Sequence, residues 1–417
     1  MEIHMSQTVV EESVDTAEKT TEETTIEATP KLNQVALVMI VKNEARKIEG
    51  SEQTVIERCL SSVRPVIDTF VICDTGSTDG TQEVIKEWAK KANIEGHVID
   101  REWKDFGTNR SEALEYAREL TNADYCLMID ADEILVYEQT FDPFAWRMSL
   151  DKDLYNVYAE YGGTRYHRPQ LTSNKKPFYY RGVLHEYVDC HEEIETREFN
   201  KGFINTPIQD GARSDDPEKY KKDAQVFEKA LATGNVDEKD YNRYLFYLAQ
   251  SYRDSQQWEK CLEAYEKRAE AGGWTEEVYY SLFQVGRMKE ILQKEKGFSV
   301  DDIIESYMRA FQQNPWRAEA LWAAARFARL KCRFDQAWSF ANHGVRLAFP
   351  DGALFVTNAV YDFMLLDEYA IACYWTGRYR ECRDACVQLL NDNKVPQEYR
   401  DRINANLEHS IEALKTR

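Results

Sequence analysis

Carboxylates and small polar residues follow three apolar runs of the chain. These groups are Lys42-Asn43-Glu44, Asp74-Thr75-Gly76 and Asp130-Ala131-Asp132. Carboxylates two residues apart, as in the third group, suit Mg²⁺ or Mn²⁺. On an acidic protein, such an ion is the natural partner for phosphate charge. The three groups therefore predict a metal-assisted site for a phosphorylated ligand.

The stretch around Asp74 allows two interpretations. It reads V-I-C-D-T-G-S-T-D-G-T from Val71 to Thr81, and Asp-Thr-Gly is also the loop with which aspartic proteases bring together two carboxylates that share one proton. No second Asp-Thr-Gly or Asp-Ser-Gly occurs in the chain. The stretch runs directly into a helical pattern, and the start of a helix after a glycine turn binds anions. An apolar strand followed by a glycine turn and a helix favours a nucleotide site over a protease.

Alternating strands and helices are predicted to position these groups. Strand-like apolar runs at 35–41, 69–73, 97–100 and 125–129 alternate with amphipathic stretches at 55–63, 79–92 and 111–120. The alternation predicts an α/β domain with a Rossmann-like, mostly parallel sheet whose faces are covered by helices. Ligands bind beyond the carboxyl ends of such strands. Asp79, with Gln82 three residues later, is expected to cap the second helix in a capping box.

The composition restricts the possible partners. The chain has 417 residues and a formal net charge of −20, which makes nucleic acid and anionic membrane surfaces poor partners. No apolar run approaches the roughly 20 residues of a membrane helix, and the first residues lack the features of a secretory signal. Nine scattered cysteines without a C-x-x-C pair indicate reduced thiols and a cytoplasmic location.

The two ends of the chain differ from its α/β part. Residues 1–34 carry eight acidic side chains against two lysines, and no aromatic residue, which predicts a disordered acidic tail. Helical spacing continues through residues 217–417. Leu248–Tyr265 and Ile303–Pro315 fit tetratricopeptide repeats, although an irregular helical domain would show the same spacing. Gly286–Gly297 is interpreted as an insertion between two helices.

Five motifs resemble family 2 glycosyltransferases of the GT-A fold. In chain order they are M-I-V-K-N-E-A from Met39, V-I-C-D-T-G-S-T-D-G-T from Val71, W-K-D-F-G-T-N-R-S from Trp103, L-M-I-D-A-D-E from Leu127 and R-G-V-L-H-E from Arg181. Each follows the element expected in that family, over about residues 35–215. The last motif is similar to that of members which also carry tetratricopeptide repeats. The resemblance implies a GT-A domain that uses a nucleotide-diphosphate sugar.

The resemblance also implies roles for single residues. Asp132 would ligate Mn²⁺ or Mg²⁺, while Asp130 would contact the ribose, or the metal through water; alternatively, Asp132 and Glu133 only cap a following helix. Asp74 would accept a hydrogen bond from the base, or else hold its own loop in an Asx-turn. Residues 165–168 form a small cationic group that could bind diphosphate. The residues expected to contact the nucleotide sugar are Val41, Asn43, Glu44, Asp74, Gly76, Arg110, Asp130, Ala131, Asp132 and Arg168.

The pair His185-Glu186 has more than one possible role. His185 could be a distal metal ligand beside the two aspartates, or it could bind a phosphate. Glu186 is the candidate general base, because an inverting transfer needs a carboxylate beside the acceptor nucleophile. Asp189 and Glu133 are the alternative bases. Neighbours on an extended strand point to opposite sides, so both residues of the pair face the site only if the chain bends there.

The sequence as a whole predicts a metal-dependent, inverting glycosyltransferase. An acidic tail (1–34) precedes a GT-A domain (35–216) and a tetratricopeptide-like domain (217–417). The resemblance favours a UDP-linked donor. The repeats are expected to present a peptide, protein or glycan acceptor, or to support a homodimer. Two alternatives stay open: a non-catalytic scaffold with a vestigial nucleotide-sugar domain, and a nucleotidyltransferase, a class that usually carries a glycine-rich, basic signature where this chain has Lys42-Asn43-Glu44.

Overall fold

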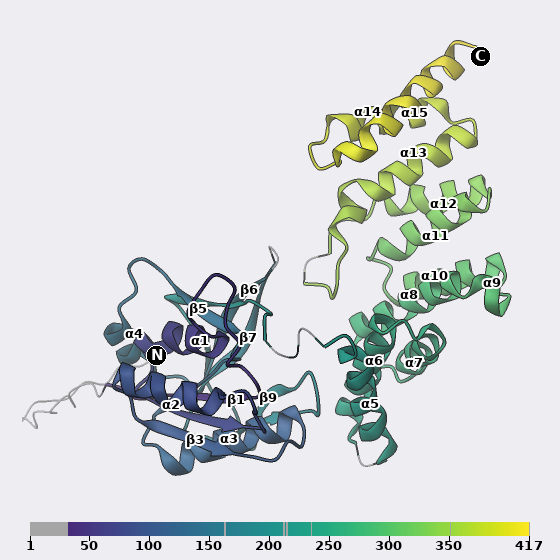
Figure 1. Cartoon of the computed structure of the whole chain (residues 1–417). Helices are drawn as coiled ribbons and strands as arrows, with labels where there is room; N and C mark the ends of the chain where they lie inside the picture. The colour runs from purple at the N-terminus through teal and green to yellow at the C-terminus, as the bar shows by residue number, and fades with distance from the viewer. Residues whose placement is uncertain are drawn as a thin grey trace, which may run out of the picture.

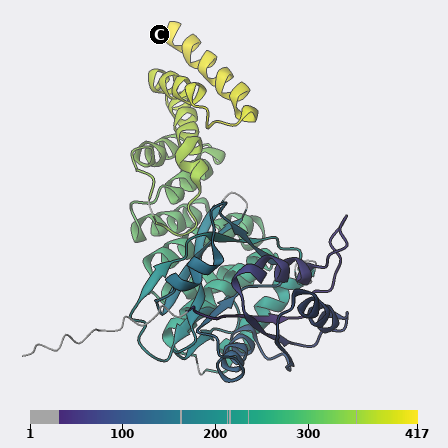
Figure 2. The same cartoon turned by 90° about the vertical axis from the view of Figure 1, so that its left-hand side faces the viewer.

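The computed structural model describes residues 32–161, 164–211, 213, 216–234, 236–350 and 352–416. An α/β domain is followed by an elongated stack of helices that ends at the C-terminus (Figure 1). The view turned by 90° shows the same stack extending away from the α/β domain (Figure 2). Residues 1–31 of the predicted acidic tail lie outside the described residues. Within the described ranges, no helix combines the length and apolar character needed to cross a membrane.

The α/β domain is built around one large mixed sheet. Its strand order is β3-β2-β1-β4-β7-β6-β11-β5, and β10 pairs with β6, while β8 and β9 form a separate two-stranded sheet. The strands are β1 (Val35–Val41), β2 (Thr69–Asp74), β3 (Gly96–Asp100), β4 (Tyr125–Met128), β5 (Glu133–Tyr137), β6 (Leu154–Tyr161), β7 (Thr164–Ser173), β8 (Phe178–Arg181), β9 (Tyr187–Cys190), β10 (Arg197–Phe199) and β11 (Phe203–Pro207). The helices are α1 (Val55–Val63), α2 (Thr81–Ala92), α3 (Phe106–Leu120) and α4 (Pro143–Ser149), with a 3-10 turn at Arg64–Val66.

Strand β1 lies at the centre of this sheet and is apolar on both faces. Val35, Leu37 and Met39 pack into the core formed with α1 and α2. Ala36 and Val38 alternate with them and pack into the second core, which contains α3. Since successive side chains of a strand point to opposite faces, a continuous apolar run is what a strand covered by helices on both faces requires.

The sheet changes from parallel to mixed along the chain. Strands β1 to β4 pair in parallel, as predicted. Strand β7 is antiparallel to β4 and to β6, and β11 is antiparallel to β5. Only two residues separate β6 from β7, and so short a connection permits only antiparallel pairing. The sequence interpretation did not identify these later strands.

The helical domain consists of helices that pack mainly against their neighbours in the chain. They are α5 (Lys219–Ala232), α6 (Glu238–Asp254), α7 (Trp258–Glu270), α8 (Thr275–Ile291), α9 (Gln293–Lys296), α10 (Val300–Gln313), α11 (Glu319–Leu330), α12 (Phe334–Gly344), α13 (Leu365–Trp375), α14 (Tyr379–Asn391) and α15 (Gln397–Lys415), with a π-helical turn at Val360–Met364 before α13.

Both stretches with tetratricopeptide spacing form packed helices. In the first, Ala249 and Tyr252 of α6 are buried with Cys261 of α7. The predicted insertion beginning at Gly286 is wrong, because α8 continues to Ile291. A β-carbon on Gly286 would lie 2.6 Å from the ring of Tyr307. This glycine therefore marks close packing of α8 against α10, not the end of a helix.

Candidate active site

The turn after β2 is held by the carboxylate of Asp74. Its Oδ1 accepts hydrogen bonds from the backbone N–H groups of Gly76 (2.9 Å) and Ser77 (2.7 Å), and Gly76 has a positive φ of 101°. The Asx-turn, which was the alternative role for Asp74, is therefore formed. Asp74 is fully buried, and its Oδ2 has no hydrogen-bond partner within the described part of the chain. Because buried polar atoms are normally paired, this oxygen is an unsatisfied acceptor beside the turn.

The end of β1 supports the same turn. The carbonyl oxygen of Val41 accepts from the N–H of Thr75 (2.9 Å) and from its hydroxyl (3.0 Å). Asn43, at φ 60°, accepts the N–H of Thr78 on its Oδ1 at 2.8 Å, and its own N–H donates to Ser77 Oγ at 2.8 Å. The Asn43 side-chain oxygen thus braces the turn.

The predicted capping box at the start of α2 is wrong. Gly80, at φ 90°, precedes the helix without a side-chain cap. Asp79 instead accepts the N–H of Thr81 (3.1 Å) on Oδ1 and that of Ala45 (2.9 Å) on Oδ2. The left-handed conformation of Gly80 displaces Asp79 from the capping position, and its carboxylate joins the two turns that follow β1 and β2.

Arg110 of α3 connects two carboxylates that are far apart in the sequence. Its Nη2 lies 2.5 Å from Asp130 Oδ1, at the end of β4, and its Nε lies 2.7 Å from Glu186 Oε1, in the loop between β8 and β9. The side chains of Arg110 and Glu186 are 13 % and 12 % exposed. Asp105 caps α3 by accepting the N–H of Thr108 at 2.7 Å, so the helix begins before the predicted 111 and carries Arg110 in its first turns.

The charges of this group depend on one another. Burial disfavours the charged form of Arg110. The attraction of Asp130 and Glu186 for that charge is stronger than the effect of burial, so the pKa of the guanidinium is raised. Burial likewise opposes ionisation of Asp130, but Arg110 and then Arg168 hold its pKa below the usual range. Arg110 and Asp130 are therefore both charged at neutral pH and joined by a charge-assisted hydrogen bond, while the contact of Arg110 with Glu186 is an ion pair.

Glu133, one of the alternative bases, already accepts hydrogen bonds from other side chains. Its carboxylate accepts from Arg168 Nη2 at 2.6 and 2.7 Å and from Asn205 Nδ2 at 2.7 Å, and the residue is 3 % exposed. It begins strand β5, so the idea that Asp132 and Glu133 cap a following helix is wrong. Asp189, the other alternative base, is also hydrogen-bonded within the β8–β9 sheet. Its carboxylate accepts a hydrogen bond from the Tyr179 hydroxyl at 3.4 Å.

The position of His185 corrects its assignment as a metal ligand. Its ring stacks on Tyr247 of α6, with centroids 4.1 Å apart. Among the described residues, no three or more His, Cys, Asp or Glu side chains gather in a way that could hold a metal. The backbone of His185 has a positive φ of 52°, and the bend directs its ring to the helical domain while Glu186 reaches Arg110.

A cavity of about 210 Å³ opens beside the ion-paired cluster. Arg110, Asp130, Glu186, Glu133 and Arg168 all line it. The other lining residues are Met128, Ile129, His167, Pro169, Gln170, Tyr180, Tyr187 and Val188. The sequence interpretation missed Tyr180 and Gln170, because β8 and β7 carry no motif that distinguishes them. Arg165 of the predicted cationic group pairs instead with Glu160, at 3.6 Å.

Comparison with known proteins identifies the α/β domain. Residues 36–196 match the family model "Glycosyl transferase family 2". These residues form a family 2 glycosyltransferase domain. An uncharacterized glycosyltransferase of Rickettsia felis is 26 % identical over 135 residues, which are 32 % of this chain and 38 % of that protein.

Other similar proteins carry tetratricopeptide repeats. A TPR repeat-containing protein of Synechococcus elongatus is 31 % identical over 167 residues, 37 % of this chain and 36 % of that protein. The chain thus spans less than two fifths of the length of these two curated relatives. Among solved structures, the C-terminal part of a TPR repeat-containing protein of Cytophaga hutchinsonii covers 48 % of this chain and 76 % of its own, with 16 % identity and a TM-score of 0.34.

The family 2 domain contains carboxylates that fit a divalent ion. Asp132 is half-buried, and burial together with the neighbouring Asp130 raises the pKa of its carboxyl group. Unlike Asp130 and Glu133, Asp132 has no ion-pair partner in the described ranges. A β-carbon on Gly211 would meet Asp132 Oδ2 at 3.0 Å, so the chain passes close to it. Mg²⁺ commonly takes one or two carboxylates and completes its ligand set with phosphate oxygens and water, which this donor set permits.

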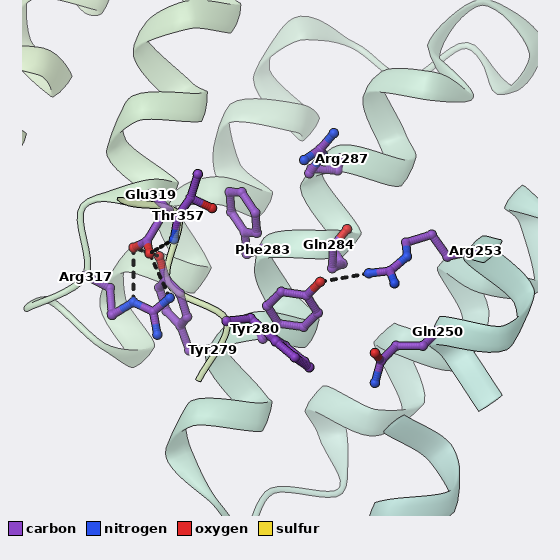
Figure 3. Close-up of a pocket in the computed structure, with 11 residues that line it drawn as sticks. Gln250, Arg253, Tyr279, Tyr280, Phe283, Gln284, Arg287, Arg317, Glu319 and Thr357 are labelled. Carbon is purple, nitrogen blue, oxygen red and sulfur yellow. Dashed lines mark hydrogen bonds and ion pairs between the residues drawn. The ribbon is translucent and has the colours of Figure 1, made fainter. Parts of the chain in front are cut away.

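A second cavity, of about 220 Å³, lies in the helical domain (Figure 3). Arg253 of α6 donates to the hydroxyl of Tyr280 at 2.8 Å on one side of it. Gln250 extends into the same space, and its Nε2 has no hydrogen-bond partner among the described residues. Arg287 also lines a neighbouring cavity of about 450 Å³. The helical domain thus presents cavities of its own.

Proposed function

We propose that the protein is a metal-dependent, inverting glycosyltransferase. It would move a sugar from a nucleotide-diphosphate sugar, UDP-linked by expectation, to a peptide, protein or glycan. The observation that carries this proposal is Arg110 joining Asp130 and Glu186 at a cavity within a family 2 domain. Donor-side and acceptor-side carboxylates of a transferase have to lie this close, because the reacting sugar must contact both.

The donor side is proposed at the carboxyl ends of β1, β2 and β4. The free Oδ2 of buried Asp74 accepts a hydrogen bond from the base. Asp132, with Asp130 directly or through water, would hold Mn²⁺ or Mg²⁺, which would supply positive charge to the diphosphate leaving group. Arg168, which lines the cavity while paired with Glu133, adds positive charge on the same side.

The acceptor side is proposed at Glu186. Its carboxylate lines the cavity and is oriented by Arg110 at 2.7 Å. Glu186 takes the proton from the acceptor nucleophile as the nucleophile attacks the anomeric carbon, from the face opposite the diphosphate. Attack from that face inverts the anomeric configuration. Ordering of the reacting groups in a half-buried cavity supplies much of the rate enhancement.

A donor screen tests the proposal. Purified full-length protein is incubated with Mn²⁺ or Mg²⁺ and a panel of nucleotide sugars, and release of free nucleoside diphosphate is measured. We expect metal-dependent release from one donor, lost in Asp132→Asn and kept in Asp384→Asn, a change at an exposed position of α14. Absence of release from every donor, together with no metal-dependent nucleotide binding in calorimetry, would contradict the proposal.

The cavities of the helical domain favour a second candidate, a non-catalytic scaffold. In that case the helices bind a partner at the space lined by Gln250 and Arg287. The donor screen separates the two functions, because a scaffold releases no nucleotide.

A further inference from the structure

The loop from Gly182 to Glu186 carries the candidate base and lies between the two domains. On the α/β side, Gly107 of α3 contacts it so closely that a β-carbon there would lie 2.2 Å from the carbonyl oxygen of Gly182. The ion pair between Arg110 and Glu186 is the second contact from α3. In the middle of the loop, α3 adds one long hydrogen bond, from the N–H of Phe106 to the carbonyl oxygen of Val183 at 3.4 Å.

Helix α6 holds the middle of the same loop through hydrogen bonds to its backbone. The N–H of Val183 donates to the hydroxyl of Tyr244 at 3.1 Å. Arg243 donates to the carbonyl oxygen of His185 through Nη2 at 2.7 Å and Nε at 3.2 Å. A cation that donates two hydrogen bonds to one carbonyl restricts its orientation more than one neutral donor does.

The side chains in the middle of the loop belong to the helical domain. Leu184 is 4 % exposed and is part of the apolar core that contains Phe227 and Tyr244. The ring of His185 stacks on Tyr247 and lies parallel to Phe227. Beside the loop, Arg181 at the end of β8 donates to Asp240 of α6 at 2.7 Å. In Figure 1, α5 and α6 are the helices next to the α/β domain.

These contacts hold a backbone conformation that the loop does not favour on its own. A φ of 52° at His185 is uncommon for a residue other than glycine and persists only where the surroundings impose it. The bend sends the His185 ring toward α6 and the next side chain, Glu186, into the cavity. Without Tyr244 and Arg243, the loop would relax toward the ordinary extended backbone, and Glu186 would leave Arg110.

We infer that α6 belongs to the active site: Tyr244 and Arg243 are positioning residues that keep the carboxylate of Glu186 beside Arg110. The role given to Glu186 rests on the proposed function, but the hold of α6 on the loop does not. The repeat domain then has a part in catalysis besides any acceptor binding, because its docking holds the loop that carries Glu186 into the cavity.

The experiment uses full-length protein with Tyr244→Phe, which removes one hydroxyl and keeps the ring. Tyr241→Phe, on the exposed side of the same helix, is the matched control, and Arg243→Met is the second variant. Amide hydrogen exchange of residues 182–187 is followed by mass spectrometry. We expect exchange about tenfold faster in Tyr244→Phe and Arg243→Met, with Tyr241→Phe unchanged and the rest of the α/β domain protected as before.

Turnover then tests whether the loop positions the base. With the donor found in the screen, we expect Tyr244→Phe to lower kcat by about tenfold while KM for the donor stays within about twofold, because only Glu186 is misplaced. In a Glu186→Gln background the same change should have almost no further effect, since residues that act through one another are not additive. A purely structural role would lower turnover equally in both backgrounds.

The outcomes separate this inference from the proposed function. Unchanged exchange at 182–187 in both variants would overturn the inference whatever the protein catalyses. Faster exchange with equal loss of kcat in the presence and absence of Glu186 would overturn positioning of the base. Faster exchange in a protein that releases no nucleotide would keep the role of α6 in holding the loop and contradict only the transferase.

Discussion

Two bends in the chain bring functional residues to the active site, and they are stabilised in different ways. The turn at 74–81 is held by Asp74, within three residues of the groups it binds, and by Asn43, which follows the neighbouring strand β1. The loop at 182–186 is held by Tyr244 and Arg243, about 60 residues away in another domain. The first bend can form as soon as β1 and β2 pair. The second also needs the two domains to dock.

The largest expected effect comes from breaking the charge cluster that ends the second bend. Arg110→Met leaves the carboxylate of Glu186, which is 12 % exposed, without its cation and also removes the ion pair of the more exposed Asp130. The change should destabilise the α/β domain by about 3 kcal/mol and abolish donor turnover. Calorimetric unfolding measures the loss. Arg165→Met is the control, because Arg165 is 56 % exposed and has a single ion pair at 3.6 Å, so we expect less than about 1 kcal/mol. Similar losses in the two variants would contradict the assignment of the cluster.

Glycine substitutions compare the two bends directly. Gly107→Ala places a methyl group against the Gly182 carbonyl, and overpacking of this kind costs about 1–3 kcal/mol. Gly76→Ala meets no atom within 4 Å but requires an alanine at φ 101°, so its cost is backbone strain of roughly 1 kcal/mol. Thermal unfolding should rank them in that order, and faster exchange at 182–187 should occur only in Gly107→Ala. The reverse ranking would show that the loop adjusts more easily than the turn.

Removing the carboxylate of the first bend should have a local effect. Asp74→Ala leaves the N–H groups of Gly76 and Ser77 without an acceptor, at a cost of about 1–2 kcal/mol. Hydrogen exchange should accelerate at 75–78 and stay unchanged at 182–187, the opposite of the pattern expected for Tyr244→Phe. Asp384→Ala, at an exposed position of α14, should leave both segments unchanged. Faster hydrogen exchange at 182–187 as well would show that the two bends are not independent.

The docked loop should also show a pH dependence. Packing of the His185 ring, followed by the charges of Arg213, Arg243 and Lys219, lowers its pKa to about 4. The unfolded chain therefore binds a proton that the folded chain resists, so this contribution is present above about pH 6.5 and is lost as pH falls toward 4. His185→Phe keeps the stacking and removes the proton, so its Tm should fall less than that of the natural chain over this range. Parallel pH profiles of Tm would contradict the prediction.

The sequence predicted those parts of the fold in which neighbouring residues decide the outcome. The apolar runs predicted β1 to β4 and their parallel pairing, and Asp74-Thr75-Gly76 left the Asx-turn open as an alternative, which the structure shows. The failures have physical causes. A glycine in the left-handed conformation at Gly80 displaced Asp79 from the capping position, and the aromatic contact of Tyr307 explains Gly286 inside a helix. Neither the backbone conformation nor the distant contact is visible in local spacing.

Within the candidate site, too, some features follow from neighbouring residues and others from contacts between distant parts of the chain. Residue type and order by themselves determined which carboxylates follow the strands. These carboxylates share one edge of the sheet, because parallel strands bring their carboxyl ends to the same edge. Only the tertiary structure decided that Arg110 joins Asp130 to Glu186 and that His185 faces α6 instead of the aspartates. Those outcomes depend on contacts between the β8–β9 loop, α3 and a helix of the other domain. Burial makes such contacts strong, and no pattern of neighbouring residues encodes them.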